Sequence, residues 1–163
     1  MDDGAVVVRA GEWKTAGAGD RLVTIGLGSC VAIVLHDAVA NVGGMAHTLL
    51  PHPLEGRPLE PAGRFVTVAV PQLLAAVVRA GADRDRVYAR LVGGATMFPQ
   101  LIGAGEVRSV GERNIQAARA ALRDAGIPVR GEALGGTAGR SVYFDVAKGE
   151  VVVKSLREPE VVL

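Results

Sequence analysis

The chain has 163 residues, of which 49% are hydrophobic and 21% charged, a balance that excludes a largely disordered chain. A net charge of +1 argues against the broad basic field used for nucleic-acid binding, and a lone cysteine excludes an internal disulfide. The first residues are acidic, and no apolar run reaches the ~18 residues of a membrane span, so we expect a cytoplasmic protein without membrane insertion.

Short β-branched runs dominate the first fifty residues and predict strands. The runs cover 5–10, 21–27, 30–37 and 42–51. The turn-rich segment 11–20 is expected to be a loop, and the Pro- and Gly-rich segment 51–63 a surface loop. Successive runs separated by glycine turns are typical of a meander, so we expect these strands to feed one sheet.

Two helices are predicted in the middle of the chain. The first covers roughly 66–80, and Pro71 implies that it either starts near Val68 or bends at the proline. A strand at 86–94 and a loop at 95–107 follow. The second helix is the clearest element, because apolar residues recur at helical spacing before Gly126, a good C-terminal stop. That stripe consists of Ile115, Ala118, Ala121, Leu122 and Ala125.

Three further strands are predicted towards the C-terminus, with a tight hairpin at Lys148-Gly149. They cover 128–134, 140–147 and 150–156. Strands at both ends with two helices between them predict an α+β or layered α/β domain, a mixed β-sheet with helices packed on it. We expect residues 1–163 to form a single domain with a short C-terminal tail.

Residues of catalytic type are few, and two of them fall on consecutive predicted strands. Cys30 follows the small residues Gly28 and Ser29, and His47 alternates with Met45 and Leu49. Taken singly, a lone cysteine and a lone histidine are usually packing residues. If the two strands pair, however, a thiol and an imidazole meet at one end of the sheet as an activated nucleophile. Gly28 and Ser29 would leave backbone N–H groups free to hold an oxyanion.

Thr24 is a candidate third member of this site. It lies on the preceding predicted strand, and its hydroxyl can accept a hydrogen bond from one nitrogen of the His47 ring and so fix the tautomer. The alternative is that Thr24 is simply a favourable strand residue. The only nearby carboxylate in the sequence is that of Asp37.

Competing motifs are weaker. The stretch GLGSCV lacks the third glycine of a dinucleotide-binding fingerprint, and no phosphate-binding GK[ST] loop is present. Cys30 and the three histidines do not have the spacing of a zinc site. We therefore expect neither a metal nor an organic cofactor.

Several motifs together resemble one family, the chemoreceptor glutamine deamidases, CheD. They are VTIGLGSCVAIVLHD (23–37), GGMAHTLLP (43–51), VGGATMF (92–98), SVGERNIQAARAAL (109–122) and LGGTAGRSVYFDVAKGEVVVK (134–154). Their order and number make the resemblance specific, and it extends over roughly residues 5–157.

The resemblance implies a cysteine hydrolase that converts glutamine side chains of methyl-accepting chemotaxis receptors to glutamate and releases ammonia. Cys30 would be the nucleophile, His47 the general base and acid, and Thr24 the third residue. The fold would be a three-layer sandwich similar to the catalytic domains of glutamine-deamidating toxins. The family also implies a partner, the CheY-phosphate phosphatase CheC, and we expect the deamidase itself to be a monomer.

Other residues are candidates for substrate or partner contact. Gly94, Thr96 and Phe98 lie in or next to one of the shared motifs. Three glycine pairs, at 43–44, 93–94 and 135–136, are either plain turns or low walls that admit a receptor helix. Arg113 and Asn114 either contact substrate or cap their helix.

A second class of function competes with the enzyme. The chain could be a non-catalytic binding module that acts through a CheC-type phosphatase or a receptor contact, with Cys30 inert. The apolar Met97-Phe98 pair favours a contact role if it is exposed, and core packing if it is not.

Overall fold

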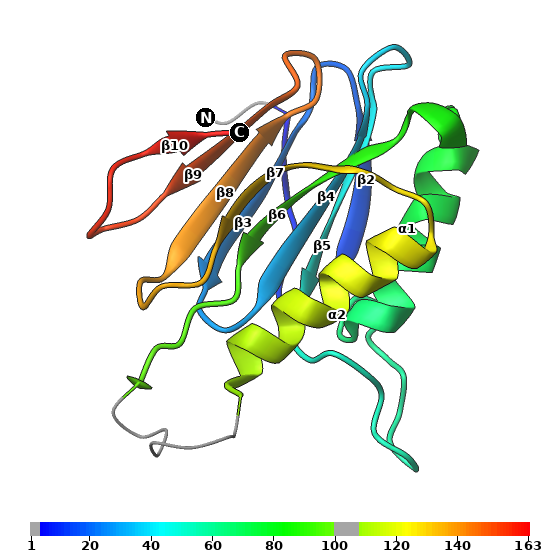
Figure 1. Ribbon diagram of the computed structural model, residues 1–163. Coiled ribbons are helices and arrows are strands. Elements are labelled where there is room, and N and C mark those ends of the chain that lie inside the picture. Colours follow the sequence, from blue (N-terminus) through cyan, green and yellow to red (C-terminus); the bar gives the residue numbers. More distant parts are fainter. Residues whose placement is uncertain (1–3, 100–107) are drawn as a thin grey trace.

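The computed structural model of the chain describes residues 4–99 and 108–163, in which two five-stranded sheets pack together and two helices cover one of them (Figure 1). The outer sheet has the order β1 (Ala5–Val7), β3 (Arg21–Leu27), β8 (Arg140–Asp145), β9 (Glu150–Lys154) and β10 (Val161–Val162). The central sheet has the order β2 (Trp13–Gly17), β5 (Val42–Thr48), β4 (Val31–Asp37), β6 (Tyr88–Gly93) and β7 (Val129–Leu134). The helices are α1 (Val66–Arg79) and α2 (Val110–Asp124).

The three layers explain the hydrophobic patterns of the strands. All seven residues of β4 are buried, because the outer sheet covers one face of the central sheet and the helices cover the other. Strands β8 and β9 alternate instead, since only one face of the outer sheet is covered. The predicted fold class, a three-layer sandwich of mixed sheets and helices, is confirmed.

Two adjacent glycines in β5 allow the layers to approach each other closely. A Cβ atom on Gly43 would overlap the ring of Phe144 in the outer sheet, and one on Gly44 would lie 2.7 Å from Leu73 Cδ1 in α1. Glycine is required at both positions by packing. The expectation that this pair forms a turn or a cleft wall is therefore wrong, because the pair lies inside a buried strand.

The N-terminal strands were expected to form a meander in one sheet, but they belong to two sheets. β3 pairs with β1 and β8 in the outer sheet, whereas β4 and β5 pair with each other in the central sheet. The chain changes sheets at residues 28–30. The segment 11–20, expected to be a loop, contains β2, which pairs antiparallel with β5 as an edge strand. The C-terminal tail adds β10 to the edge of β9.

Helix α1 begins at Val66, so Pro71 lies inside the helix and not in its first turn. The earlier start has a clear cause: Val66 N–H donates to Leu50 O at 2.9 Å and Thr67 N–H donates to Pro51 O at 3.2 Å, which anchors the first turn to the preceding loop. Helix α2 matches its prediction, and Gly126 follows it with φ = 73°, a left-handed conformation that glycine favours. Of the predicted loop 95–107, residues 100–107 lie outside the described residues.

No helix within residues 4–99 and 108–163 combines the length and the apolar character needed to cross a bilayer.

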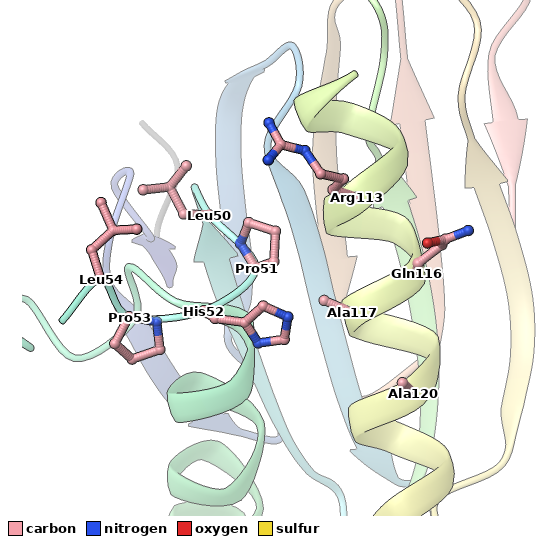
Figure 2. A pocket seen from close by; sticks show the side chains of 9 residues that line it. All are labelled: Leu50, Pro51, His52, Pro53, Leu54, Arg113, Gln116, Ala117 and Ala120. Carbon is pink, nitrogen blue, oxygen red and sulfur yellow. The ribbon is translucent and has the colours of Figure 1, made fainter. Parts of the chain in front are cut away.

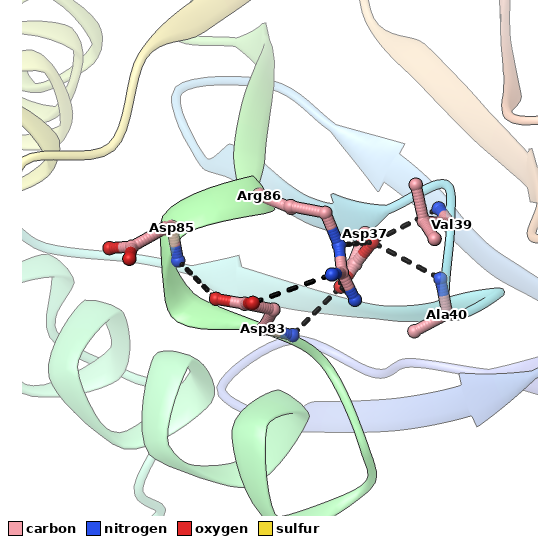
Figure 3. Close-up of polar contacts among 6 residues, drawn as sticks. All are labelled: Asp37, Val39, Ala40, Asp83, Asp85 and Arg86. Carbon is pink, nitrogen blue, oxygen red and sulfur yellow. Dashed lines mark hydrogen bonds and ion pairs between the residues drawn. The ribbon is translucent and has the colours of Figure 1, made fainter.

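A buried carboxylate joins the central sheet to the segment after α1 (Figure 3). The Asp37 side chain is fully buried and accepts hydrogen bonds from the N–H groups of Val39, Ala40 and Asp83. The guanidinium of Arg86, in the 3₁₀ turn Arg84–Arg86, donates to both carboxylate oxygens, with Nη2 3.0 Å from Oδ2. Although burial alone would raise the pKa of Asp37, these donors together hold it well below the ordinary value.

We predict that Asp37→Asn destabilises the fold by about 2 kcal/mol at pH 7, because buried N–H donors lose an acceptor while Arg86 keeps access to water. Since the native pKa is depressed, this contribution is complete above the unfolded pKa of about 3.9 and is lost as pH falls through the native pKa. Urea unfolding at pH 7 and at pH 3 measures the difference between the two proteins. A difference that stays constant over this range would contradict the argument.

Candidate active site

The candidate nucleophile lies where the chain crosses from one sheet to the other. Between β3 and β4, only Gly28, Ser29 and Cys30 separate the outer from the central sheet. The connection is held from one side, because Ala95 N–H donates to Gly28 O at 2.9 Å and Gly94 N–H donates to Cys30 O at 2.8 Å. The Cys30 side chain, half-buried, packs against the core between the sheets.

This connection needs glycine in the neighbouring segment. Gly93 has φ = 113°, and a Cβ atom there would collide with the Cys30 carbonyl oxygen. A Cβ atom on Gly94 would collide with the Ile115 side chain of α2. The 93–94 pair therefore packs directly against the backbone of the loop that carries Cys30. The 135–136 pair, with φ of 80° and 69°, forms the turn after β7.

Thr24 and His47 meet across the space between the sheets. Thr24, on β3, places Oγ1 2.7 Å from Nδ1 of His47, on β5, and both side chains are buried, with 0% and 2% exposure. The Thr24 hydroxyl has one proton, which it donates to Val8 O at 2.6 Å. Its oxygen must then accept from His47 Nδ1–H. The lone pair of the imidazole is therefore on Nε2, where a general base needs it.

Cys30 and His47 face the same side of the central sheet. Register pairs Ala32 with His47, and Cys30, two residues before Ala32 and just ahead of β4, packs against the same core cluster as Ala32. Diagonal neighbours of this kind lie about 7 Å apart. Within the described residues, His47 Nε2 is buried without a hydrogen-bond partner, and no hydrogen bond joins it to the sulfur. The three side chains share one corner of the inter-sheet space, with the thiol nearest to solvent.

Burial shifts both titratable groups towards neutrality. It raises the pKa of the Cys30 thiol, an effect that the residue's own backbone N–H partly opposes, and it lowers the pKa of the His47 imidazole. The resting pair at neutral pH is therefore a thiol and a neutral imidazole. Within the described residues no hydrogen bond joins the two groups, so the activated thiol–imidazole pair expected from the sequence stays a prediction.

The other residues that the sequence suggested for the site lie outside it or have other roles. Asp37 lies at the opposite end of β4 and is held by Arg86. Gly94 is buried, so it supports the loop and is not a contact surface. Thr96, half-buried, donates from Oγ1 to the hydroxyl of Ser109, which caps α2. Phe98 is 63% exposed, which favours the contact reading for this residue.

The roles of two residues near the site were not found from the sequence. Val8 acts through its backbone carbonyl, which no residue-type pattern can reveal. Asn114 neither caps α2 nor reaches the surface; it is fully buried and its amide nitrogen donates to Ser29 O and Leu49 O, both at 2.9 Å. A polar residue on the apolar face of a predicted helix was the signal available for it.

A groove of about 790 Å³ begins beside the nucleophile loop and runs over the open face of the outer sheet. Ile25, Met97, Phe98 and Leu156 give it exposed apolar side chains, and Lys154 and Arg157 also line it. Met97 reaches the loop itself, since a Cβ atom on Gly28 would lie 3.2 Å from its Cγ. Cys30 itself does not line the groove, so Met97 is the residue that links the groove to the nucleophile loop.

A second hollow, of about 460 Å³, lies between α2 and the segment that follows β5. Figure 2 shows Arg113 and Gln116 of α2 on one side and His52 with its neighbouring prolines on the other. Like the groove, it is lined by none of Cys30, His47 and Thr24, which lie together at the sheet crossing. In the part of the chain that the structure describes, no group of three His, Cys, Asp or Glu side chains could hold a metal ion.

The two-sheet fold, with a half-buried thiol beside a buried imidazole–hydroxyl pair, defines a candidate thiol hydrolase. Comparison with known proteins makes the assignment specific. The family model described as CheD chemotactic sensory transduction matches residues 49–155. This chain belongs to the CheD family.

Curated relatives match almost the whole chain. A protein of Geobacter metallireducens named probable chemoreceptor glutamine deamidase CheD 2 is 43% identical over 94% of this chain and 95% of its own length. One from Anaeromyxobacter dehalogenans, probable chemoreceptor glutamine deamidase CheD 1, is 46% identical over 93% and 84%. One from Archaeoglobus fulgidus, probable chemoreceptor glutamine deamidase CheD, is 39% identical over 95% and 96%.

We predict that iodoacetamide alkylates Cys30 with a half-maximal rate above pH 8.5, roughly the midpoint of an ordinary thiol, because burial disfavours the thiolate. Mass spectrometry of the alkylated protein between pH 5 and pH 10 measures this, with a short cysteine peptide as the control. A rate that has already reached its plateau by pH 7 would reveal a resting ion pair and contradict the neutral site.

Proposed function

We propose that the chain is a cysteine-dependent protein-glutamine deamidase that hydrolyses glutamine side chains of methyl-accepting chemotaxis receptors to glutamate and ammonia. Cys30 is the nucleophile, His47 the general base and acid, and Thr24 the residue that orients His47. Membership of the CheD family and the names of its curated relatives support the reaction and the substrate class. The hydrogen bond from His47 Nδ1–H to Thr24 Oγ1 supports the residue roles, because it leaves Nε2 free as a base.

In the first half-reaction, the Cys30 sulfur attacks the side-chain amide carbon of the glutamine as His47 Nε2 takes the thiol proton. A sulfur–carbon bond forms, and the carbonyl oxygen becomes an oxyanion that the Cys30 backbone N–H stabilises. Proton transfer from His47 to the amide nitrogen breaks the carbon–nitrogen bond. Ammonia leaves, and a thioester remains on Cys30.

In the second half-reaction, a water molecule attacks the thioester carbon while His47 Nε2 accepts one of its protons. The carbon–sulfur bond breaks and the proton returns to the sulfur, so the site is restored and glutamate is released. A neutral resting pair fits this sequence, because His47 must be unprotonated both times it acts as a base.

Conversion of receptor glutamines tests this proposal directly. A receptor cytoplasmic fragment is incubated with the native protein, Cys30→Ala, His47→Ala or Thr24→Val, and mass spectrometry follows the gain of about 1 Da per site, the difference between an amide and an acid. We expect no conversion with Cys30→Ala and a loss of about 10³-fold with His47→Ala.

For Thr24→Val we expect a loss of about 10-fold, because the ring keeps its place but loses the partner that fixes its tautomer. Thr67→Val, at an exposed position on α1, is the matched control and retains native activity. Equal conversion by the native protein and Cys30→Ala would remove the catalytic assignment and favour a non-catalytic binding module.

We further propose that the enzyme works as a monomer in the cytoplasm and binds a CheC-type phosphatase through the exposed end of the 93–98 segment. Met97 and Phe98 are 41% and 63% exposed beside the groove, and their apolar side chains suit a protein contact. Binding at this position would cover the approach to Cys30, and would therefore inhibit deamidation.

We predict that Phe98→Ser weakens binding of a CheC-type phosphatase by about 10-fold or more, as expected for the loss of an aromatic contact. Calorimetric titration of the purified proteins measures this. Val39→Ser is the control, because Val39 is also an exposed apolar residue, at 73%, but lies at the opposite end of β4. Equal affinity of the native protein and Phe98→Ser would exclude this surface.

A further inference from the structure

Asn114 connects the loop that carries the proposed nucleophile to the segment that follows β5, the strand of the proposed base. Its amide nitrogen donates one hydrogen bond to Ser29 O, immediately before Cys30, and a second to Leu49 O, two residues after His47. The side chain is fully buried, so both bonds are shielded from water. The amide orientation is fixed by these partners, because the flipped amide would place its oxygen against two carbonyl oxygens.

The bond to Ser29 O also sets the direction of the Cys30 N–H. In a trans peptide, the carbonyl and the N–H of one unit point in opposite directions. Ser29 O points towards α2, on the helix side of the central sheet, so the Cys30 N–H points away from α2 and towards the side that the thiol faces. Among the described residues, this N–H donates to no backbone carbonyl, and its contribution to the pKa of Cys30 places it on the side of the sulfur.

We propose that Asn114 is a positioning residue of the deamidation reaction, which orients the Ser29–Cys30 peptide so that the Cys30 N–H can stabilise the oxyanion. The inference rests on the proposed function for its chemistry, but its geometric part stands by itself. Asn114 does not touch the substrate, because it is buried beneath the loop. Its removal should therefore reduce kcat and leave the KM for the receptor unchanged.

Kinetics of receptor deamidation test the catalytic part. Asn114→Leu, which keeps the branching of the side chain but is larger and removes both N–H donors, should lower kcat by about 10²-fold, the cost typical of losing one oxyanion donor. Leu122→Ala is the matched control, because it also removes a buried group from α2 but lies away from the loop; it should lower the melting temperature and keep kcat within about threefold. Asn114→Ser, which adds no bulk, replaces Asn114→Leu if that variant does not fold.

Nuclear magnetic resonance tests the geometric part without any activity. The Ser29 carbonyl carbon and the Cys30 amide proton should both change their chemical shifts in Asn114→Leu or Asn114→Ser and keep them in Leu122→Ala. Unchanged shifts in the Asn114 variants, or a kcat within threefold of native, would overturn the role of Asn114. Absence of deamidation by the native protein and Leu122→Ala alike would instead overturn the proposed function, with the shift comparison still deciding the geometry.

Discussion

The hydrogen bond between Thr24 and His47 is the interaction on which the site depends. It joins the two sheets at the corner where the chain crosses between them. Because Thr24 donates its only hydroxyl proton to Val8 O, His47 Nδ1–H must be the donor and Thr24 Oγ1 the acceptor. Three strands, β1 with its following residue, β3 and β5, must therefore be in register before the imidazole presents Nε2 as a base. The geometry of the candidate site is in this sense a product of sheet packing.

Close packing of the layers makes that register possible. Gly43 and Gly44 remove side chains from β5 on both faces, so Phe144 and Leu73 can approach its backbone. On the next part of the same strand, His47 then reaches the outer sheet over a short distance. The nucleophile loop is held in a similar way, because Gly93 allows the backbone of the 93–95 segment to bind Cys30 O and Gly28 O directly.

The positions of most helices and strands could be predicted from the sequence, but the pairing of the strands into two sheets could not. The strands of the second half and the helix over 110–124 have strong periodicity, and their positions were predicted within a few residues. The two-sheet arrangement was missed, because a meander and a sheet crossing at 28–30 have the same local pattern. β2 was missed because this short edge strand, WKTAG, lies in a glycine-rich segment that has the composition of a loop.

For the site, too, the residues could be found from the sequence, but their chemical state could not. Cys30, His47 and Thr24 could be proposed from residue type and spacing, but the tautomer of His47 depends on a backbone carbonyl sixteen residues before Thr24. The protonation states also required the structure, since burial of each group is a property of the assembled core.

The neutral resting thiol has a consequence for the life of the protein in the cell. Peroxide and electrophilic metabolites attack thiolates far faster than thiols, and oxidation beyond the sulfenic acid is irreversible for most cysteines. Burial raises the pKa of Cys30, and a sulfur that stays protonated is spared these reactions. Burial of the Cys30 thiol thus protects a chain that has no second cysteine with which to form a rescuing disulfide.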